Sequence, residues 1–161
     1  MTSCPCPPEP VFPDAALAIA PVADTDFDRM ADLRDLAMRP SLEQLGRYDP
    51  ERSRLRLRAG FVPACMRWIR HAGQDVGFYS LRAEDGAWRL DHLYLHPDAQ
   101  GRGLGSAVLQ ALIAGLRPGG LPLRVTALRG SASNGFYVRH GFAQTGEAEW
   151  DIDYERPALP A

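Results

Sequence analysis

The chain has 161 residues, of which 45% are apolar and 24% charged, and its formal net charge is −2. This length and composition are typical of one globular domain, and the charge excludes the strongly basic footprint of a nucleic-acid-binding protein. No apolar run approaches the roughly 20 residues that a transmembrane helix needs, so we expect neither a nucleic-acid nor a membrane partner.

The cellular setting is inferred from what the sequence lacks. No positively charged segment followed by an apolar stretch marks a secretory signal peptide. The three cysteines (Cys4, Cys6 and Cys65) have neither the spacing of a disulfide framework nor the partners of a zinc site. All 18 basic residues are arginine, which we attribute to genome composition. We therefore expect a cytoplasmic protein of bacterial type without a bound metal.

The first half of the chain is predicted to hold one edge strand and several helices. Residues 1–14 are rich in proline and are expected to form a flexible arm before a domain over 15–156, which a loose tail at 157–161 follows. Apolar periodicity and helix-start signals predict an edge strand at 17–22, a helix from an N-cap at Thr25 to Pro40, and short helices over 41–46 and 50–60. Residues 52–58 also alternate like a strand, but Asp49-Pro50 before them and Gly60 after them favour a helix.

The second half is predicted to alternate between strands and helices. Three strands are expected over 64–71, 75–82 and 87–95, with a tight hairpin turn at Asp85-Gly86. A helix over 103–116, a strand over 121–128, a helix over 133–140 that ends at Gly141, and strands over 142–146 and 149–154 follow. This order predicts an α+β fold whose mixed, mostly antiparallel central sheet is flanked by helices and has one parallel crossover after Leu95.

The most informative segment joins the strand that ends at Leu95 to the next helix. Its sequence is Gln100-Gly101-Arg102-Gly103-Leu104-Gly105-Ser106. Glycines let the backbone approach a ligand closely, and the N–H groups and dipole at a helix start attract phosphate. The segment therefore predicts a pyrophosphate site made of backbone N–H groups, to which Arg102 can add charge; an ordinary turn before a helix is the alternative.

Three kinds of phosphate loop compete for this segment. A P-loop needs a lysine, and the chain has none. The dinucleotide fingerprint needs a third glycine where Ser106 stands. Gln100, Gly103 and Gly105 match the pattern Gln/Arg-x-x-Gly-x-Gly/Ala, which resembles the acetyl-CoA loop of the GNAT superfamily of N-acetyltransferases.

A second segment, Ser131 to Phe142, is similar to the other GNAT signature through Asn134, Tyr137 and Gly141-Phe142. The resemblance extends loosely over residues 17–154. It implies a GNAT-like sheet with a splayed parallel strand pair that holds acetyl-CoA, and pairing of the pantetheine arm with the backbone of Leu93, Tyr94 and Leu95. It also implies that Tyr137 protonates the departing CoA thiolate and that Asn134 orients either CoA or its own helix start. Core packing is the alternative role for Tyr137.

The general base stays open between Asp91, His92 and a bound water. The resemblance points to the strand near Asp91, whereas the reference pKa of histidine, about 6.5, suits a base better. Strict strand alternation would place Asp91 and His92 on opposite faces. Further acidic candidates are Glu43 and a period-two run that is either a solvated face or a negative funnel for an amine: Glu147, Glu149, Asp151 and Asp153.

These features predict an acetyl-CoA-dependent N-acetyltransferase that transfers an acetyl group directly to a primary amine of a small molecule or peptide. Backbone N–H groups near Leu95 would stabilise the oxyanion. The alternatives are a non-catalytic module that binds or senses acyl-CoA, and a nucleotide-binding α/β domain of another kind. The sequence leaves open the acceptor and whether the chain forms a homodimer.

Overall fold

The computed structural model describes residues 7, 9–116 and 118–161, so Cys4, Cys6 and much of the predicted arm lie outside the described residues. The chain forms two compact units. We call Phe12–Ser80 with His92–Ala107 the N-terminal unit, and Leu81–Asp91 with Val108–Ala161 and the described residues up to Val11 the C-terminal unit. The described strands form one sheet in the order β1-β2-β3-β4-β5-β7-β6, as predicted for a mixed α+β fold.

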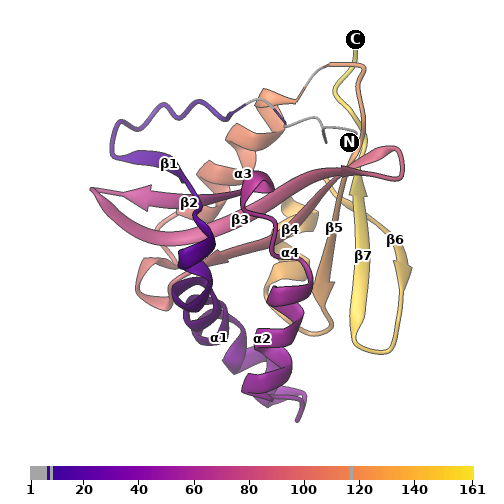
Figure 1. Cartoon of the computed structure of the whole chain (residues 1–161). Helices are drawn as coiled ribbons and strands as arrows, with labels where there is room; N and C mark the ends of the chain where they lie inside the picture. The colour runs from indigo at the N-terminus through magenta and orange to yellow at the C-terminus, as the bar shows by residue number, and fades with distance from the viewer. Residues whose placement is uncertain (1–6, 8, 117) are drawn as a thin grey trace. The chain divides into compact units, whose positions relative to one another are not determined.

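The N-terminal unit contains the antiparallel edge of the sheet. β1 (Leu17–Pro21) pairs with β2 (Met66–His71), which pairs in turn with β3 (Gln74–Glu84). The edge position of β1 is the one that its proline predicts. Helices α1 (Phe27–Gln44) and α2 (Pro50–Ala59) lie side by side (Figure 1).

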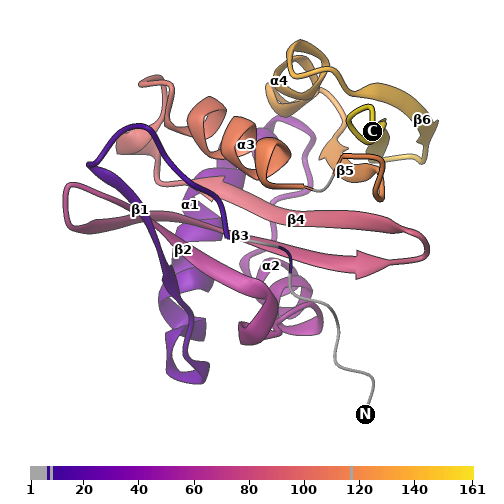
Figure 2. The ribbon, with the colours of Figure 1, turned by 90° about the horizontal axis from the view of Figure 1, so that it is seen from above.

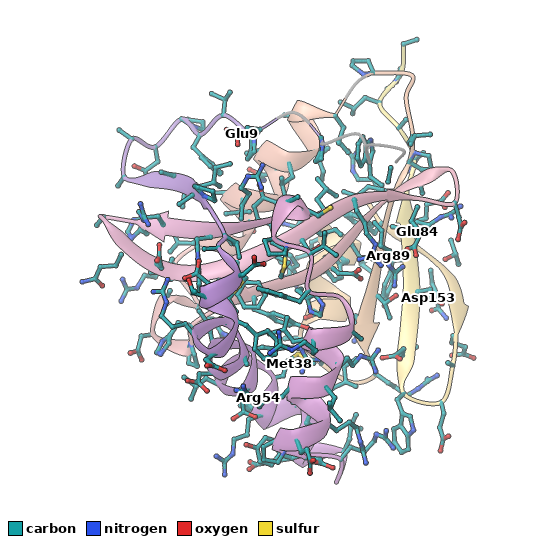
Figure 3. All side chains as sticks on the ribbon, viewed as in Figure 1. Glu9, Met38, Arg54, Glu84, Arg89 and Asp153 are labelled. Atoms are coloured by element: carbon teal, nitrogen blue, oxygen red, sulfur yellow. The ribbon has the colours of Figure 1, made fainter. Side chains whose placement is uncertain are left out.

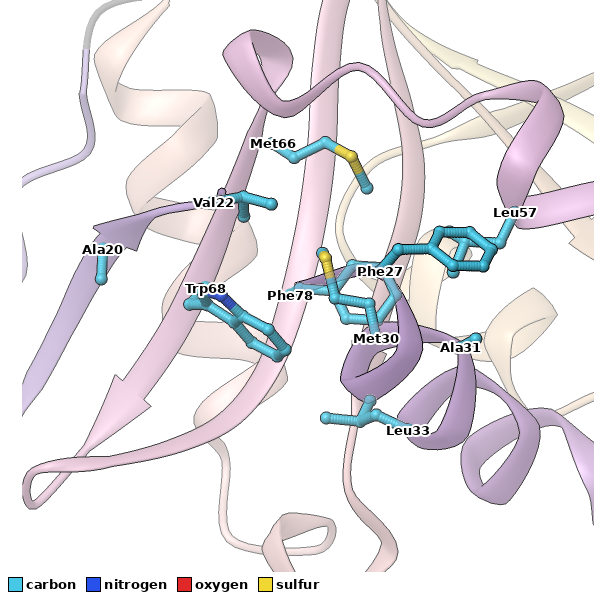
Figure 4. Close-up of a cluster of buried hydrophobic side chains, with 10 residues drawn as sticks. All are labelled: Ala20, Val22, Phe27, Met30, Ala31, Leu33, Leu57, Met66, Trp68 and Phe78. Atoms are coloured by element: carbon cyan, nitrogen blue, oxygen red, sulfur yellow. The ribbon is translucent and has the colours of Figure 1, made fainter. Parts of the chain in front are cut away.

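Apolar side chains of these helices and strands form the core of this unit. Figure 4 shows Met30 and Leu57 from the helices among Met66, Trp68 and Phe78 from the strands. Each large apolar side chain that is buried in this way contributes about 1.5–3 kcal/mol to stability. The core thus ties α1 and α2 to the strands that carry part of the candidate site.

Helix α1 differs from the prediction at both ends. A short 3-10 turn (Asp24–Asp26) precedes it, so Thr25 is not its N-cap. The Asp26 carboxylate accepts hydrogen bonds from Ala23 N at 2.9 Å and from Trp68 Nε1 at 3.0 Å, and these two donors hold the pKa of Asp26 below its ordinary value. The helix start is therefore fixed by a tertiary contact that no local pattern shows.

At its other end, α1 continues through Pro40 and absorbs the short helix predicted over 41–46. A proline inside a helix removes one backbone hydrogen bond and costs about 3 kcal/mol. An ion pair of 2.7 Å between Arg39 and Glu43 spans the proline. Gly46, at φ 67°, then closes the helix end with a 2.9 Å hydrogen bond from its N–H to Glu43 O. These contacts stabilise the last turn and recover part of the cost of the proline.

Helix α2 confirms the choice of helix over strand for residues 50–60. The Asp49 side chain accepts hydrogen bonds from the backbone N–H groups of Glu51 and Arg52, at 3.1 and 3.2 Å. Pro50 occupies the first helical position, where its missing N–H has no cost. Local capping thus outweighs the alternating sequence pattern.

The C-terminal unit begins with the tip of the β3–β4 hairpin, which Figure 2 shows. Asp85 and Gly86 both have positive φ, 49° and 76°, as a tight type I′ turn requires. β4 (Ala87–Leu95) leads through α3 (Leu104–Gly115) to β5 (Leu123–Leu128), which confirms the predicted parallel crossover. The antiparallel strands β7 (Asp151–Arg156) and β6 (Ala143–Glu147) follow on the far side of β5, after the seven-residue helix α4 (Ser133–Arg139).

The parallel ladder between β4 and β5 is short. It joins Trp88 to Leu123 and Arg89 to Arg124. β4 continues to Leu95 and β5 to Leu128, beyond the pairs that this ladder joins. Such a pair of strands is the feature that the GNAT resemblance implies.

The predicted acidic run on one face of the last strand is wrong. Glu147 lies in β6 and Glu149 in the connection to β7, so only Asp151 and Asp153 share β7. The two strands form a hairpin in which Glu147 pairs with Ile152, because the chain reverses direction between them.

None of the helices in the described ranges is long and apolar enough to cross a bilayer.

Candidate active site

The glycine-rich loop is held in place by contacts on both sides. His96 N donates to Val76 O at 2.7 Å, and a 3-10 turn (Pro97–Ala99) buries Ala99. The Gln100 side chain donates from Nε2 to Leu95 O at 3.0 Å. Gln100 therefore braces the loop against the end of β4, a role for its side chain that the sequence pattern does not reveal.

Two glycines of this loop adopt a backbone conformation that other residues rarely take. Gly101 has a φ of 76° and Gly103 a φ of 77°, and nothing lies within 4 Å of a Cβ added at either position. The first backbone bond of α3 runs from Ala107 N to Gly103 O at 3.0 Å. The backbone N–H groups of Leu104 and Gly105, in the first turn, have no acceptor inside the helix and point toward its N-terminal end, where an anion binds.

The surroundings of these N–H groups fit a diphosphate. Gly101, Arg102 and Gly103 are exposed, whereas Leu104 is buried and anchors the start of α3. Gly105 and Ser106, in the first turn, are half-buried. The Arg102 guanidinium has no hydrogen-bond or ion-pair partner in the described part of the chain. An open turn, a helix N-terminus and an exposed arginine form an arrangement that binds phosphate groups.

Gly77 allows two strands of the candidate site to approach closely, and it was not predicted from the sequence. A Cβ at this position would lie 2.2 Å from Tyr94 O and 2.8 Å from Leu95 Cδ2. The close approach therefore requires glycine, which has no side chain there. It positions the backbone of β4 at Tyr94 and Leu95, two of the residues expected to bind the pantetheine arm. A lone glycine inside a strand is the available signal, because it marks close backbone approach.

His92 has an unusual backbone conformation within β4. Its φ is 56°, in the left-handed region, yet its ring and that of Tyr94 both pack against Phe78, whereas Asp91 pairs with Arg89, as the expected alternation implies. The His92 ring lies 5.7 Å from the Tyr94 ring and 6.4 Å from the Phe78 ring, measured between centroids. Such left-handed residues are concentrated at functional sites. His92 is thus held by aromatic packing within the N-terminal unit.

Asp91 belongs to a polar network in the C-terminal unit. Arg82 Nη1 lies 2.5 Å from Asp91 Oδ2, and Arg89 Nε lies 3.3 Å from Asp91 Oδ1. Arg89 also donates to the Thr126 hydroxyl, which donates to Asp153 Oδ1 at 2.7 Å. Figure 3 labels Arg89 and Asp153, the residues that this chain of contacts links across the sheet. Both Asp91 oxygens are therefore engaged by guanidinium groups, which favours a structural role over that of a base.

Tyr137 and Asn134 both lie on α4. Tyr137 is 6% exposed, and its ring centroid is 5.4 Å from that of Phe142 and 6.3 Å from that of Tyr154. Asn134 Nδ2 donates to Leu128 O and Ser131 O, both at 2.9 Å, and Asn134 Oδ1 accepts from the Tyr154 hydroxyl at 2.8 Å. These contacts favour the helix-start role of Asn134 over direct contact with CoA.

Three of the remaining acidic candidates form ion pairs or hydrogen bonds with neighbouring side chains. Glu43 pairs with Arg39, Glu147 pairs with Arg129 at 3.1 Å, and Asp153 accepts from Thr126. Within residues 7, 9–116 and 118–161, no group of three or more His, Cys, Asp or Glu side chains is arranged to hold a metal ion.

A buried arginine, Arg34 of α1, is a second residue that sequence reasoning missed. It is 5% exposed, and its Nη1 donates to Ser53 O at 3.4 Å and to Ser53 Oγ. Its guanidinium carbon lies 5.6 Å from the centroid of the Tyr94 ring. No sequence signal distinguishes Arg34 from the other arginines of α1 and α2, because burial decides its role.

Comparisons with known proteins agree with this geometry. An acetyltransferase from Thermus thermophilus superposes with a TM-score of 0.69 and 22% identity over 88% of this chain and 97% of its own. A ribosomal-protein-S18-alanine N-acetyltransferase from Escherichia coli gives 0.66 and 18%, over 90% of this chain and 96% of its own. An N-acetyltransferase from Thermoplasma acidophilum, solved with coenzyme A, gives 0.64 and 16% over 88% and 98%. These likenesses establish the fold.

The sequence itself identifies the family. No curated protein sequence matches the chain significantly. Residues 64–144, about half of the chain, match the family model of the acetyltransferase (GNAT) domain. The matched range includes both the loop at 100–105 and the segment around Tyr137, on which the resemblance rests. The chain therefore belongs to the GNAT family of acetyltransferases.

Proposed function

We propose that this protein transfers an acetyl group from acetyl-CoA directly to the primary amine of a small molecule or a peptide. The observation that carries the proposal is the open loop at 100–105, where Gly101 and Gly103 expose backbone N–H groups at the start of α3. A diphosphate fits such a loop. The Thermoplasma acidophilum structure solved with coenzyme A supports coenzyme A as the ligand.

The proposed binding roles extend from the loop along β4. The backbone N–H groups of 100–105 hold the diphosphate, and the Arg102 guanidinium adds a charge contact. The main chain of Leu93, Tyr94 and Leu95 pairs with the pantetheine arm as an added strand would. The short β4–β5 ladder supports this assignment, since its pairs lie at Trp88 and Arg89 only.

The proposed chemistry needs one base and one acid. When bound, acetyl-CoA supplies an activated acyl carbon and a thiolate leaving group. His92 accepts the proton that the acceptor ammonium must lose, since imidazole titrates near neutral pH and Asp91 is engaged by two arginines. Tyr137 donates a proton to the departing sulfur, because a phenol with a reference pKa of about 10 is protonated at neutral pH.

The decisive experiment measures thiol release from acetyl-CoA with a panel of polyamines, aminoglycosides, amino acids and peptides. We expect release that depends on one class of amine, with an equal amount of acetylated amine detected by mass spectrometry. Binding of coenzyme A without release from any amine would instead assign the protein to acyl-CoA sensing. Tight binding of NAD or ATP in place of coenzyme A would contradict the proposal outright.

A further inference from the structure

Arg34 lies in the interior of the N-terminal unit without an acidic partner. It is the one charged side chain that is buried among the described residues. No carboxylate of the described residues lies within ion-pair distance of its guanidinium; its hydrogen bonds go to Ser53 alone. A buried cation that lacks an anion is costly, because removal from water is not repaid by a charge partner.

One edge of this guanidinium has no protein acceptor. Ser53 engages Nη1, whereas the buried Nε has no hydrogen-bond partner among the described residues. The Nε and Nη2 groups of an arginine form a fork that matches the two oxygens of a carboxylate. Arg34 is thus anchored at Nη1, while its buried Nε has a hydrogen atom that no described residue accepts.

One neighbour of Arg34, Tyr94, belongs to the proposed site, and the ring of the proposed base lies next to it. The Tyr94 ring lies 5.6 Å from the Arg34 guanidinium carbon and 5.7 Å from the His92 ring. His92 and Tyr94 are half-buried, so this cluster reaches the surface of the unit. Tyr94 therefore lies beside both a fixed cation and the proposed base.

Helix α2 is rich in arginine, but its guanidinium groups differ from that of Arg34 in having partners near the surface. This helix carries one glutamate and four arginines, namely Arg52, Arg54, Arg56 and Arg58. Arg54 pairs with Asp28, and the Arg58 guanidinium stacks 3.5 Å from the centre of the Phe27 ring. Figure 3 labels Arg54 on this helix and Met38 on α1. Helix α1 carries acidic side chains as well, Asp28 among them, so the unpaired positive charge of this unit's interior, among the described residues, is that of Arg34.

We propose that Arg34 binds a carboxylate of the acceptor, so that the preferred acceptor is an amine carrying a carboxylate on the same molecule. This inference rests on the proposed function and names its substrate class. Arg34 fixes the carboxylate through the Nε edge, Ser53 fixes Arg34, and Tyr94 separates the anion site from His92. Arginine suits the task better than lysine because its planar fork is fixed by the Ser53 contact.

The test uses matched pairs of acceptors. Each pair consists of an amino acid, or an ω-amino carboxylic acid, and its carboxamide, which keeps the amine and removes the negative charge. With the intact protein we expect kcat/KM at least about tenfold higher for the acid than for the amide in the best pair, as loss of one charged hydrogen-bonded contact predicts. Equal kcat/KM values across all pairs would overturn the inference.

Variants assign the preference to Arg34. Arg34→Met should raise KM for the acids by about 10- to 100-fold and leave the amides within about threefold. Ser53→Ala should raise the same KM by a smaller factor, since it frees the guanidinium. Arg39→Met, on the exposed side of the same helix, is the control and should change neither class. Equal losses for acids and amides in Arg34→Met would show a structural role and contradict the proposal.

Two measurements keep the outcomes distinct. Calorimetric titration with coenzyme A and a thermal melt show whether each variant is folded. If Arg34→Met does not fold, the comparison of acids with amides in the intact protein decides whether the acceptor must carry a carboxylate. Thiol release at equal rates from acids and amides overturns this inference and leaves the proposed function standing. Absence of thiol release with every amine overturns both.

Discussion

Asp91 and His92 are neighbours in the chain, but their side chains have different surroundings. Asp91 is fixed by Arg82 and Arg89, one at each carboxylate oxygen. His92 lies among aromatic rings and has a left-handed backbone conformation. Since a general base must be able to gain and lose a proton near the working pH, the imidazole is better suited to that role than the ion-paired carboxylate.

Paired substitutions test this assignment. We expect Asp91→Asn to lower the free energy of unfolding by about 1 kcal/mol, because the ion pairs are partly exposed, and to keep the pH profile of kcat/KM. His92→Gln should lower kcat by about 100-fold or more and remove the ionisation from the acidic limb of that profile. Steady-state rates between pH 5.5 and 9 provide the measurement. An unchanged profile in His92→Gln would exclude it as the base.

The Tyr137 hydroxyl is tested by removing one atom. Tyr137→Phe keeps the ring that packs against Phe142 and Tyr154, so thermal stability should change little. As the proposed acid is lost, kcat should fall by about 10- to 1,000-fold, with unchanged affinity for coenzyme A. Single-turnover kinetics with the identified acceptor provide the measurement. A kcat equal to that of the unmodified enzyme would leave Tyr137 only its packing role.

For single residues, the sequence predicts the roles that follow from a local pattern. Gly101 and Gly103 could be found because positive φ at a helix start is a local property. Arg34 could not be found, because its role depends on burial, and Gly77 was missed although a glycine inside a strand is a signal of close backbone approach. The sequence pattern also identified Asn134, and its contacts favour a role at the start of its own helix over contact with CoA.

The elements show which local signals are decisive. Pro50 and Asp49 correctly predict α2. The Asp49 side chain satisfies two backbone donors of the first turn, and this contact is local and does not depend on the rest of the fold. Pro40 misleads, because the Arg39–Glu43 ion pair and the Gly46 turn stabilise the helix beyond it. The left-handed backbone of His92 inside β4 has no signal in the sequence, because strand patterns describe side-chain alternation and not a single unusual φ. Strand and helix types are thus predictable, whereas irregularities at the site are not.

Helix α4 gives a pH-dependent property of the C-terminal unit. Burial, and then the positive charges of Arg139 and Arg156, lower the pKa of His140 at its end. As the pH falls through the reference pKa of histidine, about 6.5, the unfolded chain takes up the proton before the folded chain. The contribution of neutral His140 to stability is therefore present above this pH and is lost in acid.

We expect His140→Gln to be less sensitive to acid. Thermal unfolding midpoints at pH 7.5 and pH 5.5 should differ less in this variant than in the unmodified protein, because the group that titrates has been removed. Other groups still titrate in both proteins, so the comparison of the two differences is the relevant quantity. The same difference in both proteins would show that His140 does not contribute.

For the whole molecule, the order of elements predicts the fold class and the parallel crossover, because both follow from helix and strand types along the chain. Family membership rests on two short motifs at a spacing that the family model also matches. The acceptor is not encoded in such motifs: in our proposal its binding depends on side chains that the fold brings together from α1, α2 and β4. Arg34, Ser53 and Tyr94 illustrate this within the N-terminal unit.

The most direct test of the account is the affinity for coenzyme A, measured by calorimetry with two double variants. Gly101→Ala/Gly103→Ala places methyl groups in the loop, whereas Gly46→Ala/Gly73→Ala places them at positive-φ positions with equally open surroundings elsewhere in the same unit. The loop variant should bind at least about tenfold more weakly, and the control within about twofold of the unmodified protein. Equal affinity in the loop variant, or no binding by the unmodified protein, would contradict the account.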